Sequence, residues 1–325
     1  MKYVYLSRPF TGGARMGISR EILLWGSRNK WLADQLTSRS FTRRAVQRFM
    51  PGEELSAAID ATESLRQKDI STILTLLGEN VSETSEADAL VEYYLEVLDR
   101  IREMGFDTDI SLKPTQLGID LDFERSCNRY ETLVTRAAEL GRMVAIDIED
   151  SSYVDRTIEL YRRMRAGHSN VALCLQAYLY RTTSDLVTLL PLAPIIRLVK
   201  GAYNEPPEIA YRRKKDVDAN FLRLTDTLFQ EVSRDGGVRA FFGTHDPRMV
   251  NEIIARAEAL GLPKDAYEFQ MLYGIQRELQ TRLAAEGYRM RVLISYGESW
   301  FPWYMRRLAE RPANLLFLLR NLFSG

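Results

Sequence analysis

The sequence predicts an α/β protein built on a (βα)8 barrel of the TIM type, with extra N-terminal helices and a final helix over the barrel mouth. Short aliphatic and β-branched runs alternate along the chain with longer segments of helical periodicity. This alternation is typical of βαβ units, whose strands form a parallel sheet. Eight such units fit into about 255 residues, the usual size of a (βα)8 barrel. A doubly wound open sheet is the alternative, and the count of eight favours the barrel.

Residues 1–66 have the pattern of several short helices that precede the barrel, which we place at residues 67–325. Apolar residues recur at a rough helical period in Ile18–Leu36, and Thr42–Met50 continues in the same way. A Pro-Gly pair then interrupts the chain before the helical pattern of Glu53–Leu65.

Most of the predicted strands are apolar on both faces, as expected for parallel strands that helices cover. They are Ser71–Leu77, Ile110–Lys113, Met143–Ile148, Val171–Tyr178, Pro194–Val199, Val238–Gly243, Tyr267–Leu272 and Arg289–Ile294. The segments between them are helical by pattern, for example Ser151–Arg165, Pro247–Leu260 and Gln276–Ala285. A last helix follows the eighth strand from about Pro302.

The composition excludes several classes of protein. Forty-four basic side chains balance 44 acidic ones, which argues against a nucleic-acid-binding protein with its basic footprint. Two cysteines are too few for a disulfide scaffold or a cysteine-built zinc site, and His245 has no histidine or cysteine nearby, so we expect no metal site. No apolar run reaches the roughly twenty residues that a membrane helix needs. With no signal-peptide pattern at Met1–Phe10, the sequence predicts a cytoplasmic protein.

Ionisable side chains gather where several predicted strands end, which is where a barrel carries its active site. They are Lys113, Asp147, Arg197, Lys200 and His245. Arg197 shares the pleat face of its apolar neighbours two residues away, so its guanidinium is expected to be buried. A buried arginine needs an acceptor, which Asp147 or an anionic ligand would supply. The sequence therefore predicts a ligand site at this mouth.

Spacing alone leaves the roles of the lysines and of an arginine pair open. Lys113 or Lys200 would suit a Schiff-base barrel lyase or aldolase, and Lys200 with Gly201 would equally suit a phosphate. Arg306 and Arg307 would clamp a carboxylate or would form exposed ion pairs with Glu310 on the same helix.

Seven short motifs follow one another along the predicted barrel: Ile110–Gly118, Ile146–Asp150, Leu175–Tyr178, Arg197–Tyr203, Thr244–Asp246, Glu268–Gly274 and Arg306–Glu310. In these motifs, and in their order from about Leu74 to Leu322, the sequence resembles the proline dehydrogenase family of FAD-dependent barrel enzymes. The resemblance is specific because the motifs are separate and in the correct order. The predicted N-terminal helices resemble the family only in their general helical pattern and carry none of these motifs.

The resemblance implies oxidation of L-proline to Δ1-pyrroline-5-carboxylate, the first step of proline catabolism, by hydride transfer to N5 of FAD. It implies that Asp147 and Arg197 are catalytic, with Asp147 ordering the pocket and Arg197 beside the flavin N5 and O4 edge. The implied substrate-binding residues are Lys113, Tyr203, Leu272, Arg306, Arg307 and Glu310. The implied cofactor-binding residues are Arg197 together with Ile148, Gln176, Val199, Lys200, Gly201, Ala202, Thr244, His245 and Gln270.

The family passes its electrons to membrane quinones, so the resemblance also implies a quinone-type acceptor and transient peripheral contact with the inner face of the membrane. Leu315–Phe323 is a candidate contact surface, although core packing is the better explanation of its apolar residues.

Two positions depart from the family pattern. A tyrosine whose hydroxyl side faces the proline ring is usual late in the eighth strand, and this chain has Leu293 there. An aromatic residue shortly before the arginine pair is commonly tyrosine and is Trp303 here. Because Leu293 makes a smaller apolar wall, the sequence predicts weaker discrimination between proline and 4-hydroxyproline or another cyclic imino acid.

Overall fold

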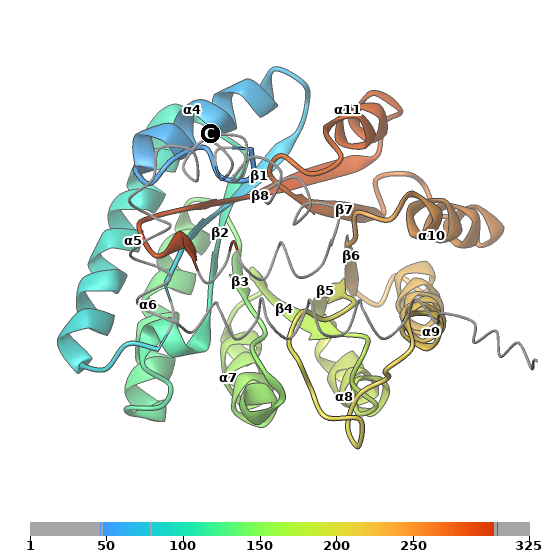
Figure 1. The fold of residues 1–325 in the computed structure, drawn as a ribbon, viewed down its shortest axis with the longest axis horizontal. Helices are drawn as coiled ribbons and strands as arrows, with labels where there is room; N and C mark the ends of the chain where they lie inside the picture. Colours follow the sequence, from blue (N-terminus) through green and yellow to red (C-terminus); the bar gives the residue numbers. More distant parts are fainter. Residues whose placement is uncertain (1–45, 47, 79, 302–303, 305–325) are drawn as a thin grey trace, which may run out of the picture. The chain divides into compact units, whose positions relative to one another are not determined.

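The computed structural model describes Val46 and residues 48–78, 80–301 and 304 (Figure 1). The chain divides into two compact units, and Arg48–Glu298 is the unit that holds the barrel. The other unit combines Met1–Gln47 with Ser299–Gly325. The predicted helices Ile18–Leu36 and Thr42–Met50, apart from a few residues of the second, and nearly all of the predicted final helix lie outside the described residues.

Eight parallel strands form a closed barrel in the order of the sequence, and β8 pairs with β1 to close it. This arrangement confirms the predicted (βα)8 barrel over the doubly wound sheet. The strands are β1 (Ser71–Leu76), β2 (Thr108–Leu112), β3 (Val144–Ile146), β4 (Val171–Gln176), β5 (Ile195–Val199), β6 (Arg239–Gly243), β7 (Tyr267–Leu272) and β8 (Arg289–Tyr296).

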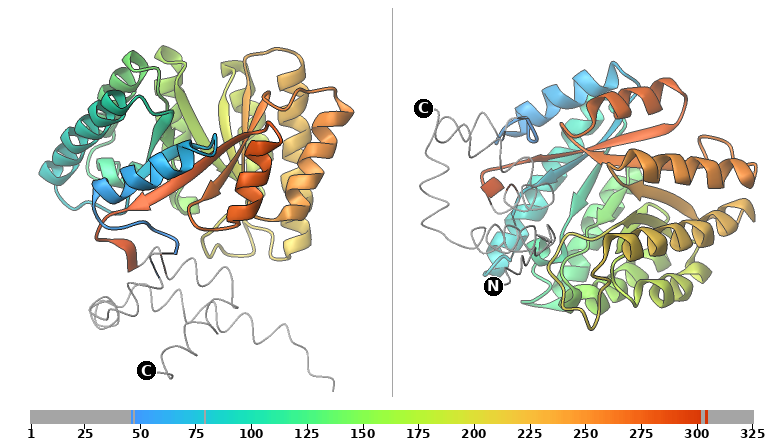
Figure 2. Two further views of the ribbon diagram at one scale, coloured as in Figure 1. Left: turned by 90° about the horizontal axis from the view of Figure 1, so that it is seen from above. Right: turned by 45° about the vertical axis from the view of Figure 1, so that its right-hand side comes forward.

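Helices surround the strands in all three views of the barrel unit (Figures 1 and 2). The α-helices are α4 (Leu55–Arg66), α5 (Thr84–Met104), α6 (Phe123–Glu139), α7 (Val154–Gly167), α8 (Thr182–Leu189), α9 (Lys214–Ser233), α10 (Pro247–Ala259) and α11 (Arg277–Ala285). The described residues also contain three short 3-10 helices, η1 (Pro114–Leu117), η2 (Ser151–Tyr153) and η3 (Leu190–Leu192). Although α4 precedes residue 67, it packs against β1 and β8 and belongs to the barrel unit.

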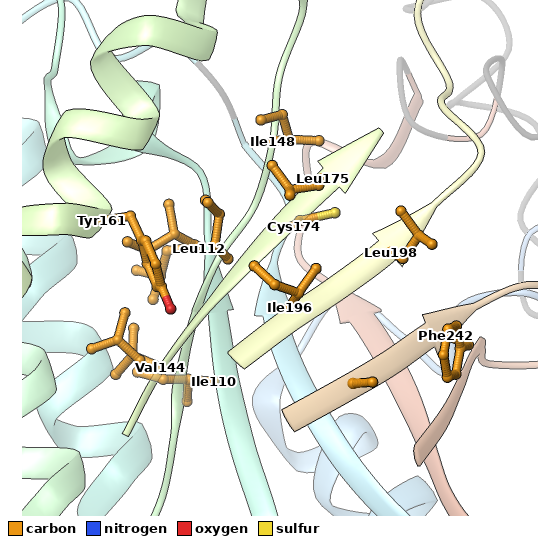
Figure 3. Close-up of a cluster of buried hydrophobic side chains, with 14 of the residues drawn as sticks. Ile110, Leu112, Val144, Ile148, Tyr161, Cys174, Leu175, Ile196, Leu198 and Phe242 are labelled. Carbon is orange, nitrogen blue, oxygen red and sulfur yellow. The ribbon is translucent and has the colours of Figure 1, made fainter. Parts of the chain in front are cut away.

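The main core lies between the strands and the helices. Side chains such as Ile110, Val144, Ile196 and Phe242 are fully buried there (Figure 3). Each apolar side chain of this size contributes about 1.5–3 kcal/mol when it leaves water. A second, smaller cluster consists of Ala145, Ala172, Ile195 and Phe241. The first three are paired in register across β3, β4 and β5, and Phe241 lies two residues beyond Arg239, the register partner of Ile195 on β6. The cluster therefore lies on the opposite face of the strands, inside the barrel.

Several strands and helices end at residues other than the predicted ones, because single turn and capping residues determine where they end. The second strand stops at Leu112 because Pro114 begins η1, which leaves Lys113 as an extended residue before it. The fourth strand ends at Gln176, two residues before the predicted end at Tyr178. The predicted helix Ser151–Arg165 divides into η2 and α7, with the Asp150 side chain capping the N–H of Ser152.

The described helices differ from membrane-spanning segments in length or in composition. Within the described ranges, none of them combines the length and the apolar character that a membrane-spanning helix needs.

Candidate active site

A buried ion pair marks the centre of the predicted site. Arg197, on β5, extends Nη2 to Oδ1 of Asp147, just beyond β3, and donates to Oγ of Ser111 on β2 at 3.3 Å. The Arg197 side chain is 6% exposed, and its Nη1 has no hydrogen-bond partner among the described residues. The structure therefore pairs Asp147 with Arg197, and it leaves one buried donor available to a ligand.

Burial changes the acid–base behaviour of Arg197. It lowers the pKa of this guanidinium to about 10, and the negative charge of Glu268 only partly offsets the effect. Arg197 still carries its proton at neutral pH. A fixed cation in a poorly solvated site acts strongly on any negative charge that develops near it.

The loop after β2 is fixed to the ends of its neighbours. Thr115 donates its N–H and its hydroxyl to the buried Glu149 carboxylate, at 3.1 and 2.7 Å. Gln116 accepts from the N–H of Lys113 at 2.9 Å and donates to the carbonyl of Leu76 at 2.8 Å. The backbone of Lys113 is thereby held between the ends of β1 and β3. No role was predicted for Glu149 or Gln116.

Two residues predicted to lie beside a flavin come together after β3 and β4. Gln176 is buried and donates Nε2 to the carbonyl of Glu149 at 2.9 Å. Ile148, in the same turn as Glu149, packs into the apolar cluster (Figure 3).

The chain after β5 passes directly over an aromatic ring. Gly201 has φ +120°, and a Cβ at this position would lie 2.4 Å from Cδ1 of Tyr178. The N–H of Tyr178 donates to the carbonyl of Lys200 at 2.9 Å, which continues the pairing of β4 with β5. Only glycine fits this approach, so close packing within the protein already accounts for the residue type at position 201.

A carboxylate holds the next part of the same loop. Glu205 accepts from the N–H and the hydroxyl of Ser151, at 2.7 and 2.6 Å, and from the Tyr178 hydroxyl at 3.4 Å. These contacts join the loops after β3, β4 and β5. Ala202 and Tyr203, both half-buried, lie on the segment between this anchor and Gly201.

Lys200 belongs to a cluster of four charges. Its Nζ lies 2.6 Å from Asp218 and 3.4 Å from Asp246, and Lys214 contacts the same two carboxylates at 2.5 and 3.2 Å. The two positive and two negative charges compensate each other. The structure therefore places Lys200 in an ion-pair network that links β5, α9 and the start of α10.

The loop after β6 contacts β7 through a histidine. Nε2 of His245 accepts the N–H of Leu272 at 2.8 Å, so a neutral His245 carries its proton on Nδ1. Thr244, next to it, is buried and accepts the N–H of Asp246 at 3.3 Å. The hydrogen bond between His245 and Leu272 joins a predicted cofactor-binding residue to a residue predicted to line the substrate pocket.

Leu293, expected from the sequence to stand where the family usually has a tyrosine, lies among aliphatic side chains. Leu293 on β8 pairs in register with Leu272 on one side and Ile73 on the other. Because residues in register share a face, the three side chains form one row inside the barrel.

A buried ionic network below the mouth was not predicted. Arg291, on β8, lies 2.9 Å from Glu268, 3.1 Å from Asp109 and 3.3 Å from Asp107. Burial raises the pKa of Asp109, although Arg291 opposes this effect. The sequence feature that could have predicted this network is the presence of charged residues at alternate positions of otherwise apolar strands.

Four residues discussed from the sequence, Trp303, Arg306, Arg307 and Glu310, lie outside the described residues. Across the part of the chain that the structure describes, no three histidine, cysteine, aspartate or glutamate side chains form a group suited to a metal ion.

Comparisons with known proteins place this geometry in a family. The family model described as "Proline dehydrogenase" matches residues 58–320. The chain is 36% identical to proline dehydrogenase of Deinococcus radiodurans over 285 residues, which cover 86% of this chain and 90% of that protein. It is 33% identical to proline dehydrogenase 1 of Bacillus subtilis strain 168 over 308 residues, covering 94% and 99%.

Solved structures show the same fold. The proline utilization A protein of Bdellovibrio bacteriovorus, inactivated by N-propargylglycine, superposes with a TM-score of 0.77 at 23% identity. The match covers 90% of this chain and 37% of that one, so this chain spans little more than a third of the larger protein.

Proposed function

Because the chain belongs to the proline dehydrogenase family, it is an oxidoreductase that oxidises proline in the first step of proline catabolism, and we propose that its cofactor is FAD, bound at the C-terminal mouth of the barrel. The observation that supports this site best is the buried Arg197–Asp147 pair with its available Nη1 donor. The proposed product is Δ1-pyrroline-5-carboxylate.

The residues at the mouth fit a flavin. Arg197 offers a buried cationic donor and Gln270 a buried acceptor, Oε1, and neither atom has a hydrogen-bond partner in the described part of the chain. A flavin, when bound, takes up the hydride that leaves the substrate. Arg197 would stabilise negative charge on the bound flavin, and Asp147 would hold Arg197 in place for this role. The other residues proposed to hold the cofactor are Ile148, Gln176, Val199, Lys200, Gly201, Ala202, Thr244 and His245.

The substrate pocket is proposed to lie beside the row formed by Ile73, Leu272 and Leu293. Leu272 and Tyr203 would line the proline ring. Lys113 and the pair Arg306 and Arg307 would bind its carboxylate, since guanidinium groups match both carboxylate oxygens, and Glu310 would hold the arginines. Because Lys200 is paired with two carboxylates, we assign it to positioning the loop before Gly201 and not to a covalent role.

Further features of the proposal concern the chain beyond this site. We propose a quinone-type electron acceptor, reached by transient peripheral contact with the inner face of the membrane, and no nucleic-acid partner. We also propose a helical segment of residues 1–66 before the catalytic barrel of residues 67–325, with α4, at the end of that segment, packed on the barrel strands.

The visible spectrum of the purified protein, followed anaerobically during addition of L-proline, tests the function. We expect a flavin band that loses its absorbance as proline is added. A band that responds to 4-hydroxyproline but not to proline would redirect the proposal to another cyclic imino acid. A protein without flavin, even after incubation with FAD, would overturn it.

A further inference from the structure

Gln270, on β7, has an amide whose orientation is fixed by a buried carboxylate. The residue is 5% exposed, and its Nε2 donates to Oε1 of Glu268 at 2.7 Å. Glu268, 2% exposed, also accepts from Nε of Arg291 at 2.9 Å. A carboxylate paired with a guanidinium only accepts hydrogen bonds, so the amide must turn its NH2 group towards Glu268. Oε1 of Gln270 is therefore directed away from that carboxylate.

The other end of this amide has no protein partner in the described ranges. Gln270 Oε1 is buried and accepts no hydrogen bond from a described residue. Gln270 shares the inner face of β7 with Glu268 and Leu272, because the side chains between them, Phe269 and Met271, belong to the outer core. Its register neighbour on β6 is Gly243, which contributes no side chain. A buried acceptor in this position is stable when a ligand supplies an N–H or O–H group.

We propose that Glu268 is a positioning residue that sets the polarity of Gln270, so that Oε1 accepts the imide N–H at position N3 of the flavin ring. This inference rests on the FAD dependence proposed above. In the oxidised flavin ring, N3 carries the only N–H group, so a site that presents a fixed acceptor is matched to that edge. Arg291 takes part by donating Nε to the same oxygen, Oε1 of Glu268, which holds that oxygen in place beside the Gln270 amide.

Binding of two flavins to the full-length protein stripped of cofactor tests the inference. FAD and N3-methyl-FAD differ only at the proposed donor, and quenching of flavin fluorescence measures both affinities. We expect the wild-type protein to bind FAD about tenfold more tightly than the methylated flavin, because one buried hydrogen bond is lost and a methyl group blocks its site. If FAD does not bind at all, the proposed function fails. If both flavins bind equally, only the present inference fails.

Two variants and a control separate positioning from general stability. Gln270→Leu removes the acceptor, and Glu268→Gln lets both amides turn, so each should bring the preference for FAD to within about twofold of equality. Gln230→Leu, an exposed glutamine on α9, should retain the wild-type ratio. A Gln270→Leu protein that keeps the full preference, or that changes only the KM for proline, would overturn the assignment. The wild-type comparison remains decisive if a variant does not fold.

Discussion

At the scale of single residues, Leu293 occupies the position at which we expect, from the sequence, the tyrosine that is usual in the family. The residue lies in an aliphatic row with Leu272 and Ile73, so the wall offers neither the bulk nor the hydroxyl of a tyrosine. An apolar pocket rejects a ligand that only adds a hydroxyl by a modest factor. We therefore expect the wild-type protein to accept 4-hydroxyproline alongside proline.

The variant Leu293→Tyr should restore discrimination. Its larger ring would narrow the space beside the substrate, and we expect the ratio of kcat/KM for proline to that for 4-hydroxyproline to rise about tenfold. Leu293→Met, which keeps an apolar chain of similar volume, is the matched control and should leave the ratio unchanged. Steady-state kinetics with both substrates measures the effect. An unchanged ratio in the tyrosine variant would place the wall elsewhere.

The sequence allowed a buried acceptor for Arg197 to be predicted, either Asp147 or an anionic ligand, because a charged residue on an apolar strand face must find a partner, and the structure pairs it with Asp147. It did not allow the contact between His245 and Leu272 to be predicted, since that bond depends on how β6 and β7 are aligned. The partners of Gln270 and Glu268 were missed for a related reason. Each looked like a single polar residue until the barrel register brought Arg291 beside them.

At the scale of elements, the strands were easier to predict than their ends. Short aliphatic and β-branched runs identified all eight strands, and most of these runs are apolar on both faces because helices cover the strands outside and other strands' side chains cover them inside. The ends depend on single turn residues. Pro114 closes β2 early, and the Asp150 cap inserts a turn of 3-10 helix before α7. Such contacts have too little sequence signal to be found by periodicity.

The cluster of Lys200, Lys214, Asp218 and Asp246 connects three elements and should make stability depend on pH. Burial alone would raise the pKa of Asp246, but Lys214, Lys200 and the N–H of Arg248 outweigh it and lower that pKa to about 2. Folding therefore favours the ionised carboxylate. Its stabilising contribution is complete above the usual aspartate pKa of about 4 and is lost as the pH falls towards 2.

The variant Asp246→Asn tests this contribution. Asparagine keeps a capping oxygen for α10 but not the charge, so the variant should be less stable than the wild-type protein at pH 6. We expect the difference in the free energy of unfolding to shrink at pH 3 relative to pH 6, since the Asp246 carboxylate of the unfolded chain takes up a proton between these values and that of the folded protein does not. Urea denaturation at the two pH values measures it. A difference that stays constant between them would show that the charge has no role.

At the scale of the whole barrel, Arg291 connects the strands that close the cylinder. From β8 it contacts Glu268 on β7, Asp109 on β2 and the carbonyl of Thr72 on β1. Its side chain is 7% exposed, and the Glu268 and Asp109 side chains are 3% and 5% exposed. Removing one member of such a buried network leaves the others charged and without compensation, which typically costs about 3–5 kcal/mol.

We therefore expect Arg291→Met to lower the free energy of unfolding by about 3–5 kcal/mol at neutral pH. Arg289→Met, at the exposed first position of the same strand, is the matched control and should change it by no more than about 0.5 kcal/mol. The two losses are compared by urea denaturation.

The pH dependence gives an independent check, because burial without Arg291 would raise the pKa of Asp109 further. A carboxyl group with a raised pKa in the folded state stabilises the fold below its unfolded pKa and loses that contribution as the pH rises. The deficit of Arg291→Met should therefore be larger at pH 8 than at pH 5, and equal deficits at both values would show that the carboxylates do not depend on Arg291 for their charge.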